Sequence, residues 1–288
     1  MDGGATVVTG TTSQGQAHER AWRTIASGEL GIDPGRITVI EGVTDAIATG
    51  VGAVGSRSVQ TAGLAIHEAA ADVVSQGARI AADMLEAAPV DVVLNRDLGA
   101  FHVTGTPSRS IGWGELAAEM QARDKQLSCD HVYENEGRDV YPSGCHVAVV
   151  EVDTETGEWT LVRYVAVDDA GVRVDNQSVD DQLRGGIALG VAQVLGEESR
   201  FDEMGNPLST NFLDYQIIAI DQLPQIELHA QVVPSSFNAG GYKAVGESGP
   251  IGATPAVHNA VVDALSHLGI DNIDIPCTPQ RVWRALRS

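Results

Sequence analysis

Lysine is the residue that this chain most clearly lacks. Among its 288 residues only Lys125 and Lys243 are lysines, and 18 Lys and Arg side chains face 39 Asp and Glu side chains. The formal net charge is therefore −21. A surface of this sign repels nucleic acid and anionic membranes. We expect no nucleic-acid partner.

Cysteine and long apolar runs are also scarce. Cys129, Cys145 and Cys277 are widely spaced and form no CxxC pair, zinc pattern or iron–sulfur pattern. No apolar run is long enough to cross a bilayer, and the first residues lack the basic and apolar regions of a signal peptide. A cytoplasmic location with reduced thiols and no membrane span is expected.

The first part of the chain alternates predicted strands and helices. The β-branched residues at 5–10 and 36–42 predict strands, and a helix is predicted over 13–30, with Ser13 as its N-cap. A glycine-rich loop at 49–58 precedes an alanine-rich helix that extends to about Glu86. Residues 90–105 predict two strands around a turn.

The second part begins after the polar segment 124–143. Two alternating strands around the turn 154–157 predict a hairpin over 145–171, and a helix is expected at 179–198. A strand at 226–233 and a closing short strand and helix follow, with Pro279 at the helix start. The chain is predicted to be an α+β (mixed α/β) protein of two interlocking subdomains, residues 1–125 and 140–288.

The most constrained titratable group is Glu247, in the sequence GYKAVGESGPIGA at 241–253. Its loop is rich in glycine, which lets a bulky group approach the backbone, and a helix is predicted directly after it. The free N–H groups and positive dipole of a helix start favour an anion. Glu247 is a candidate general base beside an anionic cofactor. A structural acid bonded to loop N–H groups is an equal alternative on local sequence alone.

Gly50, Gly52 and Gly55 match GxGxxG, which by itself suggests a dinucleotide site. The first glycine lies well beyond the strand end and no acid has the expected spacing, so the context of the match argues against NAD. Glycines before a helix still suit phosphate, and Arg57 adds a forked donor. The alternative is a tight loop with a surface arginine. No HExxH or GxSxG is present, so a zinc protease or serine hydrolase is not expected.

Seven segments of the chain, taken in their order, resemble a known family more specifically than any single motif does. These segments are VVTGTTSQGQ, ELGIDPGRITVIEGVTD, GVGAVGSRS, GCHVAVVEVDTETGEWTLVRYVAVDDAG, DDQLRGGIALGVAQVLGEE, GYKAVGESGPIGATPAVHNAVVDAL and IDIPCTPQRVWRAL. Together they resemble the molybdenum hydroxylase family, specifically the large, molybdopterin-binding subunit of the xanthine dehydrogenase, aldehyde oxidase and carbon monoxide dehydrogenase group. The likeness is to the C-terminal half of that subunit only.

The resemblance implies a fold, a cofactor and a reaction. The fold is the second molybdopterin-binding lobe, and the cofactor is molybdenum–molybdopterin, usually its cytosine dinucleotide in bacteria. The reaction is hydroxylation of an electrophilic carbon with water as oxygen source. Glu247 matches the catalytic glutamate, a general base whose pKa burial beside the anionic cofactor would raise. It is not a metal ligand, because the pterin holds the molybdenum.

The resemblance also implies cofactor contacts. These are Gln14, Gly15 and Gln16 in an SQGQ loop, Gly55, Ser56 and Arg57 in a GSR loop, Asp168, Asp169 and Gln182 facing the dinucleotide, and Lys243, Val245 and Gly246 before the glutamate. Helix capping is the plainer interpretation of residues 10–18 alone. The chain departs from the family at Leu189, where glutamine is common, and at Ser248 and Pro250, where the family commonly reads GEAGT.

The absent N-terminal half of the subunit is an implied partner. Iron–sulfur and flavin subunits are implied too, because this chain has neither iron–sulfur cysteines nor a flavin motif. The chain is expected to be a split subunit, a truncation or an excised piece. Carbon monoxide, aldehydes and N-heterocycles all stay open as the small-molecule substrate. The alternative is a non-catalytic subunit that only binds partners.

Overall fold

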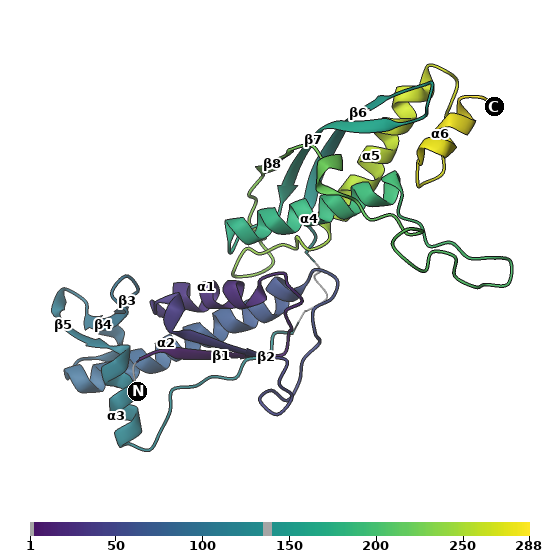
Figure 1. The fold of residues 1–288 in the computed structure, drawn as a ribbon. Helices are drawn as coiled ribbons and strands as arrows, with labels where there is room; N and C mark the ends of the chain where they lie inside the picture. The colour runs from purple at the N-terminus through teal and green to yellow at the C-terminus, as the bar shows by residue number, and fades with distance from the viewer. Residues whose placement is uncertain (1–2, 135–139) are drawn as a thin grey trace. The chain divides into compact units, whose positions relative to one another are not determined.

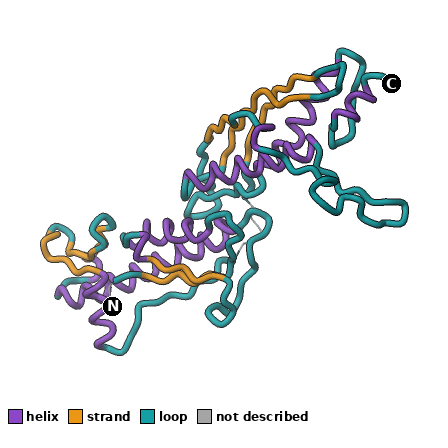
Figure 2. Tube along the Cα trace, viewed as in Figure 1, coloured by secondary structure: helices purple, strands orange, loops and turns teal. Residues whose placement is uncertain are grey.

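The computed structural model describes residues 3–134 and 140–288, which form two compact units. The first unit comprises Met1–Val140 and Pro234–Tyr242, and the second comprises Tyr141–Val233 and Lys243–Ser288. Both units mix helices and strands (Figure 1, Figure 2). The return of Pro234–Tyr242 to the first unit has no counterpart in the division expected from the sequence.

The first unit begins with two parallel strands, β1 (Ala5–Thr9) and β2 (Ile37–Glu41), joined through helix α1 (His18–Leu30). Both predicted strands are confirmed, but α1 begins five residues after Ser13. The Ser13 N–H donates to Glu41 Oε1 at 3.0 Å, which holds the loop against the end of β2. Ala17, in the left-handed conformation, precedes the first helical residue instead.

Helix α2 (Leu64–Leu85) follows a single π-helical turn, Val59–Gly63, and packs on α1. A Cβ on Gly63 would lie 3.2 Å from Ile25 and 3.4 Å from Trp22, so glycine lets the two helices approach closely at this point. The buried Trp22 and Ile25 side chains of α1 form the core between these helices and the β1–β2 pair.

A small antiparallel sheet completes the first unit, with strands β3 (Val92–Asn95), β4 (Ala100–Val103) and β5 (Thr106–Gly112), followed by α3 (Trp113–Ala122). The two strands predicted over 90–105 correspond to β3 and β4. Strand β5 was not predicted, because its five leading residues are exposed and carry no apolar alternation.

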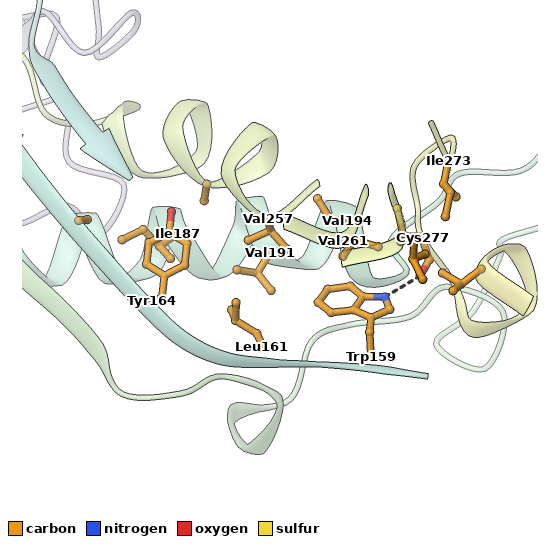
Figure 3. Packing of buried hydrophobic residues seen from close by; sticks show 14 residues of the cluster. Trp159, Leu161, Tyr164, Ile187, Val191, Val194, Val257, Val261, Ile273 and Cys277 are labelled. Carbon is orange, nitrogen blue, oxygen red and sulfur yellow. Dashed lines mark hydrogen bonds between the residues drawn. The ribbon is translucent and has the colours of Figure 1, made fainter. Parts of the chain in front are cut away.

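The second unit is built on a hairpin of β6 (Ser143–Val152) and β7 (Trp159–Asp169), as predicted. Strand β8 (Ile226–Ala230) adds to β7 in parallel. Helix α5 (Ser248–Ser266) packs against β6 and β7, and helix α4 (Asn176–Leu195) packs on α5. Side chains from β7, α4 and α5, including Tyr164, Ile187 and Val257, fill the core (Figure 3).

The two long helices of this unit contact each other through glycine. A Cβ on Gly186 of α4 would lie 3.1 Å from the Cα of Gly249 of α5, and one on Gly249 would lie 2.8 Å from the Cα of Gly186. Neither position has room for a side chain, so the pair of glycines fixes how closely α5 approaches α4 directly after Glu247.

The chain closes with α6 (Pro279–Ala285), which has its proline in the first turn as predicted. The prediction of a short strand directly before α6 is wrong. The Cys277 N–H donates to Val194 O at 2.7 Å and Cys277 O accepts from Trp159 Nε1 at 2.7 Å, so this segment bonds to α4 and to an indole rather than to a strand (Figure 3).

Single 3-10 turns occur at Pro34–Arg36, Pro89–Asp91 and Ile220–Gln222. Among the described residues, none of the helices combines the length and the apolar character that a membrane crossing requires.

Candidate cofactor loops and catalytic glutamate

Two loops of the first unit touch at a pair of glycines. The loop after β1 contains Gly10, and the loop before α2 contains Gly50; a Cβ on Gly10 would lie 2.5 Å from the Cα of Gly50. A Cβ on Gly50 would lie 2.4 Å from Gly10 O, and the Gly52 N–H donates to that oxygen at 3.3 Å. The fold thus joins the SQGQ and GSR loops. This contact also explains why residue 50, the first glycine of GxGxxG, is a glycine, because no side chain would fit there.

The SQGQ loop presents amide groups that orient one another. Gln16 Oε1 accepts from the Gln14 N–H at 2.5 Å, and Gln16 Nε2 donates to Gln14 Oε1 at 2.9 Å. Gln14 Nε2 donates to Thr12 Oγ1 at 2.8 Å. Gly15 between them has a φ of 99°, and a Cβ added to it would meet nothing within 4 Å, so its backbone is open to a ligand.

The GSR loop places a guanidinium group at a helix start. Gly55 and Ser56 have φ values of 63° and 55°, two successive left-handed residues, and the side chain of Arg57 is exposed. A non-glycine residue with positive φ is uncommon and costs free energy, and such residues concentrate at functional sites. A Cβ added to Gly55 would meet nothing within 4 Å. This open glycine, the exposed guanidinium and the first turn of the following helix are together suited to phosphate.

In the second unit, the backbone on both sides of Glu247 is anchored. Gln182 Nε2 of α4 donates to Gly246 O at 2.8 Å, and the Lys243 N–H donates to Ala170 O, after β7, at 3.0 Å. Glu247 O accepts from the Ile251 N–H at 3.2 Å, as the residue that precedes α5. Glu247 itself is exposed. The prediction that a helix starts directly after it is confirmed.

Lys243 forms an ion pair with Asp169, which is buried at the end of β7, with Nζ 2.5 Å from Oδ2. Burial acts to raise the pKa of Asp169, but hydrogen bonds that stabilise the ionised carboxylate outweigh this effect. Hydrogen bonds from Lys243 and from the N–H groups of Gly171 and Val233 leave this pKa below its ordinary value. The carboxylate is therefore ionised and ties the Glu247 loop to the sheet.

Asp168 belongs to a buried chain of three polar side chains that the sequence did not reveal. Its Oδ2 lies 3.1 Å from His146 Nε2, and His146 Nδ1 lies 2.7 Å from the Tyr164 hydroxyl. Burial, and then the charge of Asp168, raise the pKa of Tyr164, which stays protonated. His146 occupies an inward position of an alternating strand, and that pattern was the available signal.

The predicted site residues thus fall into two sets. Gln14, Gly15, Gln16, Gly55, Ser56 and Arg57 lie on the joined loops of the first unit, and Asp168, Asp169, Gln182, Lys243, Val245, Gly246 and Glu247 lie in the second. Asp168, Asp169, Gln182 and Lys243 all have partners within the protein. The contact of Asp168, Asp169 and Gln182 with a dinucleotide stays a prediction. The observed partners of Asp169, Gln182 and Lys243 give these three residues a role in holding the Glu247 loop.

Replacing Gly252 with alanine tests how tightly the first turns of α5 are held. A Cβ there would lie 2.5 Å from Nδ1 of His146, whose ring is fixed by two hydrogen bonds. We expect Gly252→Ala to lower the free energy of unfolding by about 1–3 kcal/mol, the usual cost of overpacking. The control is Gly185→Ala in α4, where an added Cβ would meet nothing within 4 Å. There alanine should raise the free energy of unfolding by up to about 1 kcal/mol. Urea unfolding measures both, and equal effects would contradict the expectation.

Comparison with known proteins identifies the family. The sequence model of the Molybdopterin cofactor-binding domain matches residues 1–224. The chain belongs to this family. It is 35% identical to the carbon monoxide dehydrogenase large chain of Hydrogenophaga pseudoflava, over 99% of this chain and 36% of that protein. It is 33% identical to the nicotine 6-hydroxylase large subunit of Paenarthrobacter nicotinovorans, over 99% of this chain and 36% of that one.

The fold agrees with a solved structure. Carbon monoxide dehydrogenase from Oligotropha carboxidovorans superposes with a TM-score of 0.88 at 34% identity, covering 96% of this chain and 34% of that chain. The predicted mixed fold and the resemblance to the molybdenum hydroxylase large subunit are confirmed. The chain spans just over a third of the length of these relatives.

Proposed function

We propose that this chain is the molybdenum-cofactor-binding segment of an oxidoreductase that hydroxylates an electrophilic carbon with oxygen from water, with Glu247 as general base. One observation carries the proposal. Glu247 is exposed, while the backbone that bears it is anchored from α4 through Gln182 and to the residue after β7 through Lys243. A general base must come within hydrogen-bond reach of the proton that it takes, and an exposed glutamate on a fixed backbone is suited to that role.

The residues of the first unit fit a phosphate-bearing, heteroaromatic cofactor. The paired amides of Gln14 and Gln16 can donate to and accept from a heteroaromatic ring, and Gly15 leaves space beside them. Arg57 and the helix start after it suit a pyrophosphate. We propose the cytosine dinucleotide form of molybdenum–molybdopterin, which supplies the oxidation–reduction chemistry when bound.

The task of the second unit is to hold and move a proton. Glu247 accepts a proton in the hydroxylation step, and the ion pair of Lys243 with Asp169 keeps its loop in place. Asp168 acts farther away, through His146, by fixing the side chain on which Gly252 packs.

Arg57 provides the test of the cofactor assignment. In the assembled enzyme, Arg57→Ala removes a phosphate donor, so we expect the molybdenum and pterin content per chain to fall about tenfold or more after purification. The control is Arg79→Ala, an equal loss of charge at an exposed position of α2. Elemental analysis and pterin fluorescence measure the content. Wild-type content in the Arg57 variant would place this side chain on an ordinary surface.

The remaining proposals concern the whole enzyme. The carbon monoxide dehydrogenase and nicotine hydroxylase relatives are a large chain and a large subunit, and this chain spans about a third of their length. We propose that the N-terminal half of such a subunit and separate iron–sulfur and flavin subunits are its partners, in a cytoplasmic enzyme. The two relatives are named for chemically different substrates, so carbon monoxide, aldehydes and N-heterocycles all stay in the proposal.

A further inference from the structure

The segment that follows α4 forms an arm, residues 196–217, whose base is tied to the second unit (Figure 1, green loop after α4). Arg281 Nη2 of α6 donates to Glu198 Oε1 at 2.6 Å, and the Tyr215 hydroxyl donates to Glu197 Oε2 at 3.2 Å. Ser209 Oγ donates to Glu198 O at 2.9 Å, which joins the two sides of the arm. The arm is therefore attached at a defined place.

Hydrogen bonds also fix both turns of the arm. The Asp202 carboxylate accepts from the N–H groups of Met204 and Asn206 at 2.9 and 2.8 Å, and Asn206 O accepts from the Asp202 N–H at 2.9 Å. In the second turn, Asn211 Oδ1 accepts from the Leu213 N–H at 2.8 Å. These turns are preorganised, so little conformational entropy is lost when their side chains bind a surface.

The side chains on these fixed turns are large and apolar, and they face solvent. The exposed fractions are 61% for Phe201, 88% for Met204, 82% for Phe212 and 99% for Leu213. Scattered apolar residues on a surface are ordinary, but aromatic and large aliphatic residues gathered on one rigid projection are typical of an interface. The hydrogen bonds of the turns do not require apolar side chains at these four positions, because polar residues would leave the same turns intact.

We infer that this arm is a docking element, and that its partner is the part of the large subunit that this chain does not contain. The inference rests on the proposed function. The relatives extend well beyond the matched region, because the chain covers only 36% of the Hydrogenophaga large chain. A second copy of this chain is a poor occupant, since each copy has a net charge of −21 and the two would repel.

The test uses the full chain co-expressed with a tagged segment of the Hydrogenophaga pseudoflava large chain, namely the part outside the region of likeness. The arm variant is Phe212→Ser with Leu213→Ser. The control is Val90→Ser with Leu98→Ser, two apolar residues of the first unit that are 86% and 73% exposed. We expect the dissociation constant of the arm variant to rise at least tenfold, and that of the control to stay within twofold.

The outcomes separate this inference from the proposed function. Equal binding by the arm variant and the wild type, or no complex with the wild type at all, would overturn the docking role. So would a discrete dimer of the chain alone that the arm variant abolishes, because a second copy would then be the occupant. Molybdenum content reports separately: an arm-dependent complex without molybdenum supports the docking inference and counts against the cofactor assignment. Coincident unfolding curves for all variants confirm that folding is unchanged.

Discussion

Glu247→Gln in the assembled enzyme is expected to lower turnover by about a hundredfold or more, the usual scale for loss of a general base. Glutamine keeps the size of the side chain but cannot accept a proton at neutral pH. The backbone anchors from Gln182 and Lys243 do not involve the carboxylate, so the loop should keep its position. Molybdenum content should therefore remain at the wild-type level. Steady-state kinetics and elemental analysis on the same preparation measure both quantities.

The control for this substitution is Glu155→Gln, the same chemical change at an exposed position of the β6–β7 turn. It should leave turnover within twofold of wild type. A Glu247 variant that turns over within a few-fold of wild type would show that another group is the base. A variant that instead loses its molybdenum would assign Glu247 to cofactor retention, and a complex with no turnover even in the wild type would favour the non-catalytic alternative.

The second large effect is expected when the chain is prepared alone. Without the N-terminal half of the subunit, we expect it to retain almost no molybdenum and to form heterogeneous assemblies. Outside the arm, Val147 of β6 and Val162 of β7 are about half exposed, and monomers seldom leave such surfaces uncovered. Mutual repulsion of chains with a charge of −21 opposes association, so the assemblies should grow as salt screens it.

Size-exclusion chromatography with elemental analysis measures this effect, on the chain alone and on the co-expressed pair. The pair should elute as one discrete complex that retains metal. A monodisperse monomer that holds one molybdenum per chain without help would show that this segment suffices, and the split-subunit proposal would be wrong. Running both samples at low and high salt separates charge repulsion from a specific interface.

Much of the fold could be predicted because its elements have local signals. Alternating residues at 145–171 predict the hairpin of β6 and β7, and the turn between them is marked by its own composition. The helix after Glu247 and the proline at the start of α6 were likewise predicted from neighbouring residues. Each of these signals lies within about ten residues of the element that it specifies.

The predictions that failed depend on partners that are distant in sequence. Ser13 does not cap α1, because the helix begins only at His18, and the Ser13 N–H is bonded instead to Glu41, 28 residues away. The segment before α6 forms no strand, because Cys277 bonds to Val194 and Trp159. Strand β5 has polar residues that resemble a loop, and only pairing with β4 makes it a strand.

The sequence by itself determined the kinds of element, the glycine-rich loops, the family and the candidate base Glu247. These follow from composition, from periodicity and from motifs in a fixed order, all of which are properties of the linear sequence. Only the tertiary structure decided that Gly10 must meet Gly50, and that Asp168 bonds to His146 rather than standing free. Such contacts require two segments to arrive at the same place, and no local pattern contains that information.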